Sequence, residues 1–306
     1  MSSNNNCKLI QQDGYWRGEF HAMASPCELL IETEDESLAL SLTKLAFNEA
    51  QRIEHKFSRY RQDNIVYKIN NSHGNIVSVD EETALLLDYA EQCYEMSDGS
   101  FDVTSGVLRE AWKFDCSDNV PSRNKVKSIL PRIGWKKVNW NHPEFILPEG
   151  MEIDLGGIGK EYAVDRTAML LRAHSDISIL INYGGDLFST KPKKDGTGWV
   201  IGIEKPNLLL ALNNKLSPRQ SVEEFQLKQG GIATSGDVYR YLLKGGIRYC
   251  HILDPRTGWP VAAAPHSVTV VAESCIEAGI LATLAMLSGK SANRFLKEQD
   301  VQFWIH

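Results

Sequence analysis

The order of apolar and polar residues along the 306-residue chain predicts a mixture of helices and strands. Apolar residues recur every three to four positions in the long segments and alternate singly in the short ones. The expected helices cover residues 37–60, 80–96, 160–174 and 275–287. The expected strands cover residues 18–24, 27–31, 152–155, 178–182, 198–204, 225–227, 246–252 and 267–272. Because helices and strands do not alternate strictly, we expect an α+β fold with a mixed, largely antiparallel sheet core and packed helices.

The same pattern predicts one domain with two irregular segments. Residues 1–18 are interpreted as a polar N-terminal segment, and residues 19–306 as a single domain. Residues 115–150 are polar and contain proline, which favours a surface excursion or a small subdomain. Residues 206–224 are polar and are expected to form a loop.

The composition and the charge indicate where the protein is expected to act and which partners are not favoured. The chain is 42% hydrophobic and 24% charged, as in soluble globular proteins, and its formal net charge of -6 favours neither a nucleic acid nor an anionic membrane as partner. No run approaches the roughly 20 apolar residues of a membrane span, and the N-terminus lacks the pattern of a signal peptide. Cys7 follows asparagines and does not resemble a lipoprotein cysteine. We therefore expect a cytoplasmic protein.

The six cysteines form no recognisable site. They are widely spaced and include no Cys-x-x-Cys pair, which argues against a zinc site or a redox dithiol. We interpret them as small, mostly buried hydrophobic residues. They are Cys7, Cys27, Cys93, Cys116, Cys250 and Cys275.

His251 is the strongest candidate for chemistry. It lies between a turn at Ser235-Gly236-Asp237 and a loop rich in proline and glycine at residues 254–260. Loops of this kind, with hydroxyls and carboxylates nearby, often carry binding or catalytic residues.

A glycine turn at residues 156–159 precedes Lys160 and an expected helix. Glycines allow close approach of a ligand, and the free amides of a first helical turn attract phosphate. The spacing fits neither the dinucleotide fingerprint nor a P-loop. The alternative is an ordinary strand-to-helix turn with a surface lysine.

Three further segments have both a functional and a structural interpretation. Residues 97–106 offer carboxylates and hydroxyls for a ribose or ribityl chain, or simply cap a helix end. Residues 184–186 read Gly-Gly-Asp, which is also an ordinary turn. Thr283 follows Gly279 by four residues and so shares its helix face, although most helical threonines are structural.

Taken together and in this order, these segments resemble the ApbE family of flavin transferases, which move FMN from FAD onto a threonine hydroxyl of another protein. The family's Gly-x-Phe-Asp-x-Thr motif is matched at residues 99–104, and its His-x-x-Asp-Pro-x-Thr-Gly motif at residues 251–258. Ala24 stands where the family has glycine. The other matching segments are residues 23–25, 57–60, 154–165, 184–186 and 235–237.

The resemblance implies FAD as the donor substrate and, as partner, an acceptor protein that carries a target threonine. It implies that His251 is the base that activates the threonine hydroxyl. Met23 and Tyr60 would flank the flavin ring, and Lys160 would lie beside the pyrophosphate. The other residues expected to contact FAD are Ser100, Phe101, Asp102, Asp154 and the backbone of Ile252 and Leu253.

The resemblance also implies a magnesium ion, whose site differs here from the family pattern. The Gly157 carbonyl and Thr283 match two of its ligands, but Gly279 stands where the family has an aspartate. Glu277 is two residues away and points about 200° around the helix, so it is no substitute. Glu161 stands where a glycine is usual. We therefore expect magnesium binding to be weakened.

Three functions follow as hypotheses. The first is an FMN transferase that uses His251 as base and FAD as donor. The alternative is a non-catalytic relative that binds FAD or a partner and has lost its metal. A metal-free hydrolase using His251 is the third.

Overall fold

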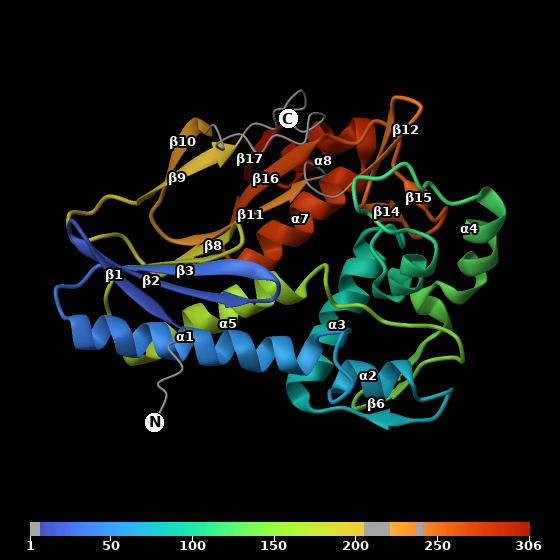
Figure 1. Ribbon diagram of the computed structural model, residues 1–306, viewed down its shortest axis with the longest axis horizontal. Helices are drawn as coiled ribbons and strands as arrows, with labels where there is room; N and C mark the ends of the chain where they lie inside the picture. Colours follow the sequence, from blue (N-terminus) through green and yellow to red (C-terminus); the bar gives the residue numbers. More distant parts are fainter. Residues whose placement is uncertain (1–6, 205–220, 237–240) are drawn as a thin grey trace.

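The computed structural model describes residues 7–204, 221–236 and 241–306, and within them an eight-stranded sheet forms the core (Figure 1). Every neighbouring pair in this sheet is antiparallel. The predicted α+β fold with a largely antiparallel sheet is confirmed. In spatial order the strands are β1 (Lys8–Gln12), β2 (Tyr15–Ala22), β3 (Ser25–Ile31), β7 (Ile179–Tyr183), β8 (Asp186–Ser189), β11 (Gly230–Gly236), β16 (Ser267–Ala272) and β17 (Gln302–Ile305).

Three long helices cover one face of the sheet. They are α1 (Glu36–Phe57), α5 (Gly159–His174) and α7 (Cys275–Leu287) (Figure 1). Asp35 and Ser274 cap α1 and α7 by accepting a hydrogen bond from a first-turn N–H, which sets where these helices begin. The fourth predicted helix is α3 (Glu81–Met96), which packs into the same core. No helix in the described part of the chain is long and apolar enough to cross a membrane.

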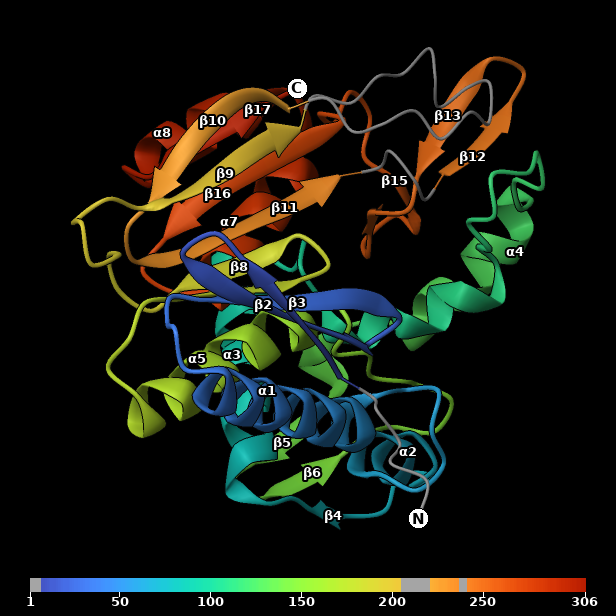
Figure 2. The ribbon, with the colours of Figure 1, turned by 60° about the vertical axis from the view of Figure 1, so that its left-hand side comes forward.

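A hairpin of β9 (Trp199–Glu204) and β10 (Ser221–Leu227) lies over the other face (Figure 2). Its inward side chains Trp199 and Ile201 are buried in a separate cluster with Ile232 of β11. The loop expected over residues 206–224 is thus wrong for residues 221–224, which pair with β9. Residues 206–220 lie outside the described residues.

The N-terminal prediction also needs correction. Residues 8–18, expected as a polar segment ahead of the domain, pair as β1 and the start of β2 at the edge of the sheet. Leu9 and Trp16 pack against the main core. An edge strand needs apolar residues on one face only, so its sequence is mostly polar.

The strand expected over residues 152–155 is absent, because this described segment has no strand partner. It is held instead by local bonds. The Asp154 N–H donates to the Val103 carbonyl over 2.8 Å, and Asn70 exchanges two hydrogen bonds with the backbone of Ile153. The segment is buried at Ile153 and Leu155 and leads directly into the glycine turn.

Residues 115–150 are more than a surface excursion. Helix α4 (Arg123–Ile129) buries Val126 and Ile129 in a second core with Trp112 of the preceding segment. The hairpins β12 (Tyr241–Lys244) with β13 (Ile247–Cys250), and β14 (Leu253–Asp254) with β15 (Trp259–Pro260), contribute to that second core. Gly258 is packed so closely that an added Cβ would lie 2.5 Å from Val126 Cγ1.

The remaining elements are short. They are α2 (Ile65–Asn70), α8 (Ala292–Glu298), the strands β4 (Val77–Ser78), β5 (Asn139–Asn141) and β6 (Glu144–Ile146), and the 3₁₀ helices η1 (Val103–Glu110), η2 (Leu130–Arg132), η3 (Trp135–Lys137) and η4 (Gly289–Ser291).

Glu82 joins three helices through a half-buried charge cluster. It accepts hydrogen bonds from Arg52 over 2.7 and 2.8 Å, from Lys56 over 2.6 Å and from the Tyr162 hydroxyl over 2.8 Å. The bonds from Arg52 lower the pKa of Glu82 from 4.5 to about 2, although burial opposes this. Helices α1, α3 and α5 are thereby tied together at one point.

Replacing Glu82 by glutamine should reduce the free energy of unfolding by about 2 kcal/mol at pH 7, less than the pKa shift alone implies, because solvent screens these partly exposed charges. Because the folded-state pKa lies below the unfolded one, this stabilisation is present above about pH 4.5 and is lost as the pH falls towards 2. Urea unfolding at several pH values measures it, with the exposed Glu81→Gln variant as control. A Glu82→Gln variant with the parent's stability at pH 7 would show that the cluster contributes nothing.

Candidate functional site

The turn between β2 and β3 holds Met23 in a strained position. Met23 and Ala24 both have left-handed backbones, with φ of 51° and 55°, between the paired residues Ala22 and Ser25. Two left-handed residues are what a tight two-residue hairpin turn requires, and glycine normally supplies one of them. The Met23 N–H donates to Glu54 of α1 over 2.8 Å, which fixes the turn.

A buried ion pair lies beside this turn. Lys160, in the first turn of α5, is 2.6 Å from Asp186, the first residue of β8. The Asp186 side chain is only 4% exposed and that of Lys160 30% exposed. Burial by itself would lower the pKa of Lys160, but the Asp186 carboxylate outweighs burial and raises it. Lys160 therefore stays charged, and its ammonium group is held beside the Asp186 carboxylate.

Three segments meet at Lys160. Gly184 and Gly185 make the turn before Asp186 with φ of 64° and 102°. A Cβ added to Gly184 would lie 2.7 Å from Ser25 Cβ and 3.7 Å from Lys160 Nζ. These contacts bring together the Met-Ala-Ser turn at residues 23–25, the Gly-Gly-Asp turn at residues 184–186 and the start of α5. The three motifs therefore lie close enough to belong to one site.

Asp154 and Tyr60 are joined by an arginine that the sequence analysis did not single out. Arg59 donates to Asp154 over 2.6 Å and to the Tyr60 hydroxyl over 2.9 Å. Its guanidinium lies 5.0 Å from the centre of the Tyr60 ring, and Tyr60 is 82% exposed. Asp154 also accepts from the N–H of Gly156 in the glycine turn. Arg59 lies within residues 57–60, one of the segments that match the family, and it is the second-to-last residue of that segment.

The segment at residues 100–102 packs against the glycine turn at residues 156–159. The Phe101 ring lies against Gly157, where an added Cβ would come within 3.2 Å of it. Asp102 is buried and caps η1, accepting from the N–H and hydroxyl of Thr104 and from the N–H of Trp135. Asp102 thus makes the capping bonds of the structural interpretation. It follows the half-buried Ser100 and the buried Phe101 in the chain.

His251 follows β13 and stands at the junction of the two cores. Its ring makes an edge contact with Phe114, with the ring centres 6.3 Å apart. Ile252 donates its N–H to Cys250 Sγ, and Leu253 pairs with Pro260. The second core therefore determines where the His251 loop lies. Ser235 and Gly236 end β11, and Asp237 of the same motif lies outside the described residues.

The residues expected to hold magnesium, Gly157 and Thr283, come from the glycine turn and from α7. Gly157 is exposed, and its carbonyl accepts no hydrogen bond from the described residues. Thr283 of α7 is 3.4 Å from the Ser235 hydroxyl. No group of three or more histidine, cysteine, aspartate and glutamate side chains within the described ranges is arranged to hold a metal.

Glu161 fills the space beside Gly279. An added Cβ on Gly279 would lie 2.6 Å from Glu161 Cγ and 2.9 Å from its Oε1. Burial, reinforced by the nearby Asp186, raises the pKa of Glu161 to about 8. A carboxyl group from α5 therefore lies beside Gly279 of α7, the position where the family has an aspartate.

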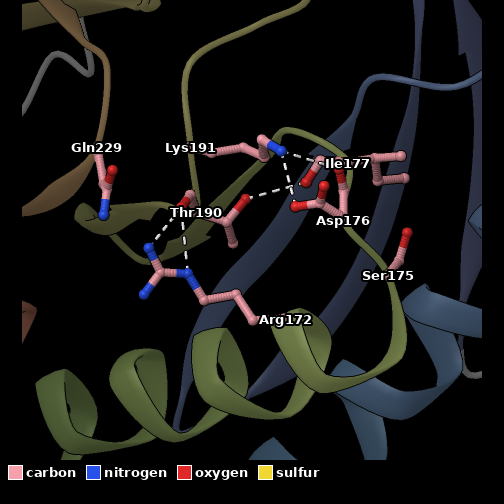
Figure 3. Close-up of a pocket in the computed structure, with 7 residues that line it drawn as sticks. All are labelled: Arg172, Ser175, Asp176, Ile177, Thr190, Lys191 and Gln229. Atoms are coloured by element: carbon pink, nitrogen blue, oxygen red, sulfur yellow. Dashed lines mark hydrogen bonds and ion pairs between the residues drawn. The ribbon is translucent and has the colours of Figure 1, made fainter.

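A pocket of about 300 Å³ opens at the other end of α5 (Figure 3). Its polar groups bond to one another: Arg172 donates to the Thr190 carbonyl, and Lys191 pairs with Asp176. Arg172 is about 18 Å along the helix from Lys160, so this pocket is separate from the candidate site. It is lined by Arg172, Ser175, Asp176, Ile177, Thr190, Lys191 and Gln229.

Comparison with known proteins gives a consistent result. The sequence profile of the ApbE family matches residues 23–305. A protein of Vibrio cholerae serotype O1 named FAD:protein FMN transferase is 29% identical over 308 residues, covering 98% of this chain and 83% of its own length. An Escherichia coli K12 protein of the same name is 28% identical, covering 81% and 71%. The crystal structure of the ApbE protein from Thermotoga maritima superposes with a TM-score of 0.83 at 30% identity, covering 95% of this chain and 94% of its own. This chain is therefore a member of the ApbE family.

Proposed function

We propose that the protein transfers FMN from FAD to an acceptor protein. The observation that carries this proposal is the convergence of three family motifs on the buried Lys160–Asp186 pair. The curated relatives that match most of the chain are named for the same reaction.

Lys160 would bind the pyrophosphate of the FAD substrate. The N-terminus of α5 has no side-chain cap, so its amide groups and the Lys160 ammonium offer positive charge to the same anion. Asp186 keeps the ammonium in place without reaching solvent itself. The flavin ring would lie between Met23 and Tyr60. The hydrogen bond from Arg59 to the Tyr60 hydroxyl would orient the tyrosine ring for this contact.

His251 would accept the proton of the attacking threonine hydroxyl. The hydroxyl oxygen forms a bond to the phosphorus of the FMN half, the pyrophosphate P–O bond breaks, and AMP leaves with the electron pair. A neutral hydroxyl is a poor nucleophile, so the step needs a base near neutral pH, which an imidazole supplies. The backbone of Ile252 and Leu253 would complete the substrate cleft beside it.

Magnesium, when bound, would neutralise charge on the pyrophosphate as AMP departs. The Gly157 carbonyl and the Thr283 hydroxyl would hold it, since both are hard oxygen ligands.

FAD should bind at least about tenfold more tightly than riboflavin, because only FAD brings a pyrophosphate to Lys160. FMN should fall between them. Calorimetry with the three ligands measures this order, and Lys160→Gln should narrow the difference while the exposed Lys136→Gln should not. Equal affinities for the three flavins would show that the pyrophosphate does not contribute to FAD binding.

Transfer itself is tested by incubating the protein with FAD, magnesium and a threonine-bearing acceptor peptide. Flavin fluorescence that stays with the peptide in a denaturing gel supports the proposal. FAD binding with no labelled peptide would favour the alternative, a non-catalytic flavin-binding relative.

A further inference from the structure

Glu161 and Gly279 form a complementary pair across two helices. Glu161 lies in the first turn of α5, and its side chain occupies the volume next to the Gly279 Cα on α7. An added Cβ at position 279 would come 2.6 Å from Glu161 Cγ, which is closer than side-chain atoms pack. Either helix can therefore supply a carboxylate to this space, but there is no room for a carboxylate from both helices.

One oxygen of the Glu161 carboxyl group, Oε2, has no hydrogen-bond partner among the described residues. This oxygen is also shielded from solvent. A buried polar atom without a partner costs about 1–3 kcal/mol, and more when it is charged. A bound ion is one explanation for a buried oxygen of this kind.

The charges around Glu161 favour a cation. Asp186 and Asp165 are acidic neighbours, while Lys160 is already bonded to Asp186 over 2.6 Å. Both oxygens of Asp165 accept from the N–H groups that begin α7, so Asp165 is occupied as a cap. The cluster thus brings together three carboxyl groups, those of Glu161, Asp186 and Asp165, with the single lysine Lys160.

We propose that Glu161 supplies, from α5, the carboxylate of a divalent-cation site shared with the Thr283 hydroxyl and the Gly157 carbonyl. Thr283 lies one turn beyond Gly279 on the same face of α7, about 6 Å along the axis. Gly157 lies in the glycine turn, four residues before Glu161 in the chain. The three groups offer hard oxygens, which suit Mg²⁺ with waters and phosphate oxygens filling its remaining positions. The choice of magnesium rests on the proposed function, but the site rests on these residues.

The test measures Mn²⁺ binding by electron paramagnetic resonance, with and without FAD, in the full-length protein. Glu161→Gln keeps the shape of the side chain and removes its charge, and it should weaken Mn²⁺ binding at least about tenfold. Glu277→Gln, which removes an exposed carboxylate from α7, is the matched control and should bind like the parent. Thermal unfolding of each variant shows whether Glu161 only fills space, because that role would change stability and not metal affinity.

The exchange Glu161→Gly with Gly279→Asp moves the carboxylate from α5 to α7. It should regain Mn²⁺ affinity, whereas Gly279→Asp alone should destabilise the protein by crowding Glu161. Parent-like Mn²⁺ binding by Glu161→Gln, a folded exchange variant that regains no affinity, or a parent that binds no Mn²⁺ would each overturn the proposal. Failure to bind FAD would instead count against the proposed function, because Mn²⁺ binding to the FAD-free protein is measured separately.

Discussion

Replacing His251 with alanine is expected to lower the rate of FMN transfer by about 10²–10⁴-fold while FAD remains bound. The loss follows from removing the group that takes the proton from the acceptor hydroxyl. The FAD contacts proposed for Lys160 and Met23 come from other elements, so the substrate should still bind.

The measurement is single-turnover labelling of an acceptor peptide, normalised to the fraction of protein that holds FAD. His174→Ala is a suitable control, since His174 is exposed at the far end of α5. If His251 merely packs against Phe114, its removal would reduce stability and leave the rate per folded molecule unchanged. A variant that transfers at the parental rate would remove His251 from the mechanism.

Replacing Gly231 with alanine should reduce the free energy of unfolding by about 3 kcal/mol or more. An added Cβ would lie 2.3 Å from the backbone N of Cys275 and 2.4 Å from the carbonyl carbon of Ser274. Those atoms are backbone at the start of α7 and have no side-chain rotation to relieve the overlap. The helix must therefore move away from β11, and the bond from Cys275 to Asp165 of α5 is disturbed with it.

Gly159→Ala is the matched control for this prediction. No heavy atom lies within 4 Å of an added Cβ at Gly159, the first residue of α5. Its effect on stability should stay within about 1 kcal/mol. Urea unfolding of the two variants separates the effect of the close contact from the general effect of replacing glycine, and equal stabilities would show that β11 and α7 tolerate a methyl group between them.

The long helices and the fold class follow from the sequence because they depend on local periodicity. Helix α7 covers residues 275–287 as predicted, since an apolar run begins directly after the capping Ser274. The short strands were harder to predict. Strand β8 is buried on both faces, and β11 contains three glycines, so neither shows the alternation of a half-buried strand. Residues 152–155 do alternate, but the tertiary structure leaves them without a strand partner.

The motifs were readable one at a time, and their order was enough to indicate the family. What the sequence did not reveal is which side chains meet. Arg59 lies 95 residues from Asp154 in the chain and bonds to it, and Glu161 meets Gly279 across two helices. The absence of the family's aspartate at position 279 predicted a weakened metal site. A comparison of sequences matches each residue only with the family residue at the same position. The packing of α5 against α7 places another carboxyl in the vacated volume, and only the tertiary structure decides that, since side-chain contacts between distant elements depend on how those elements dock.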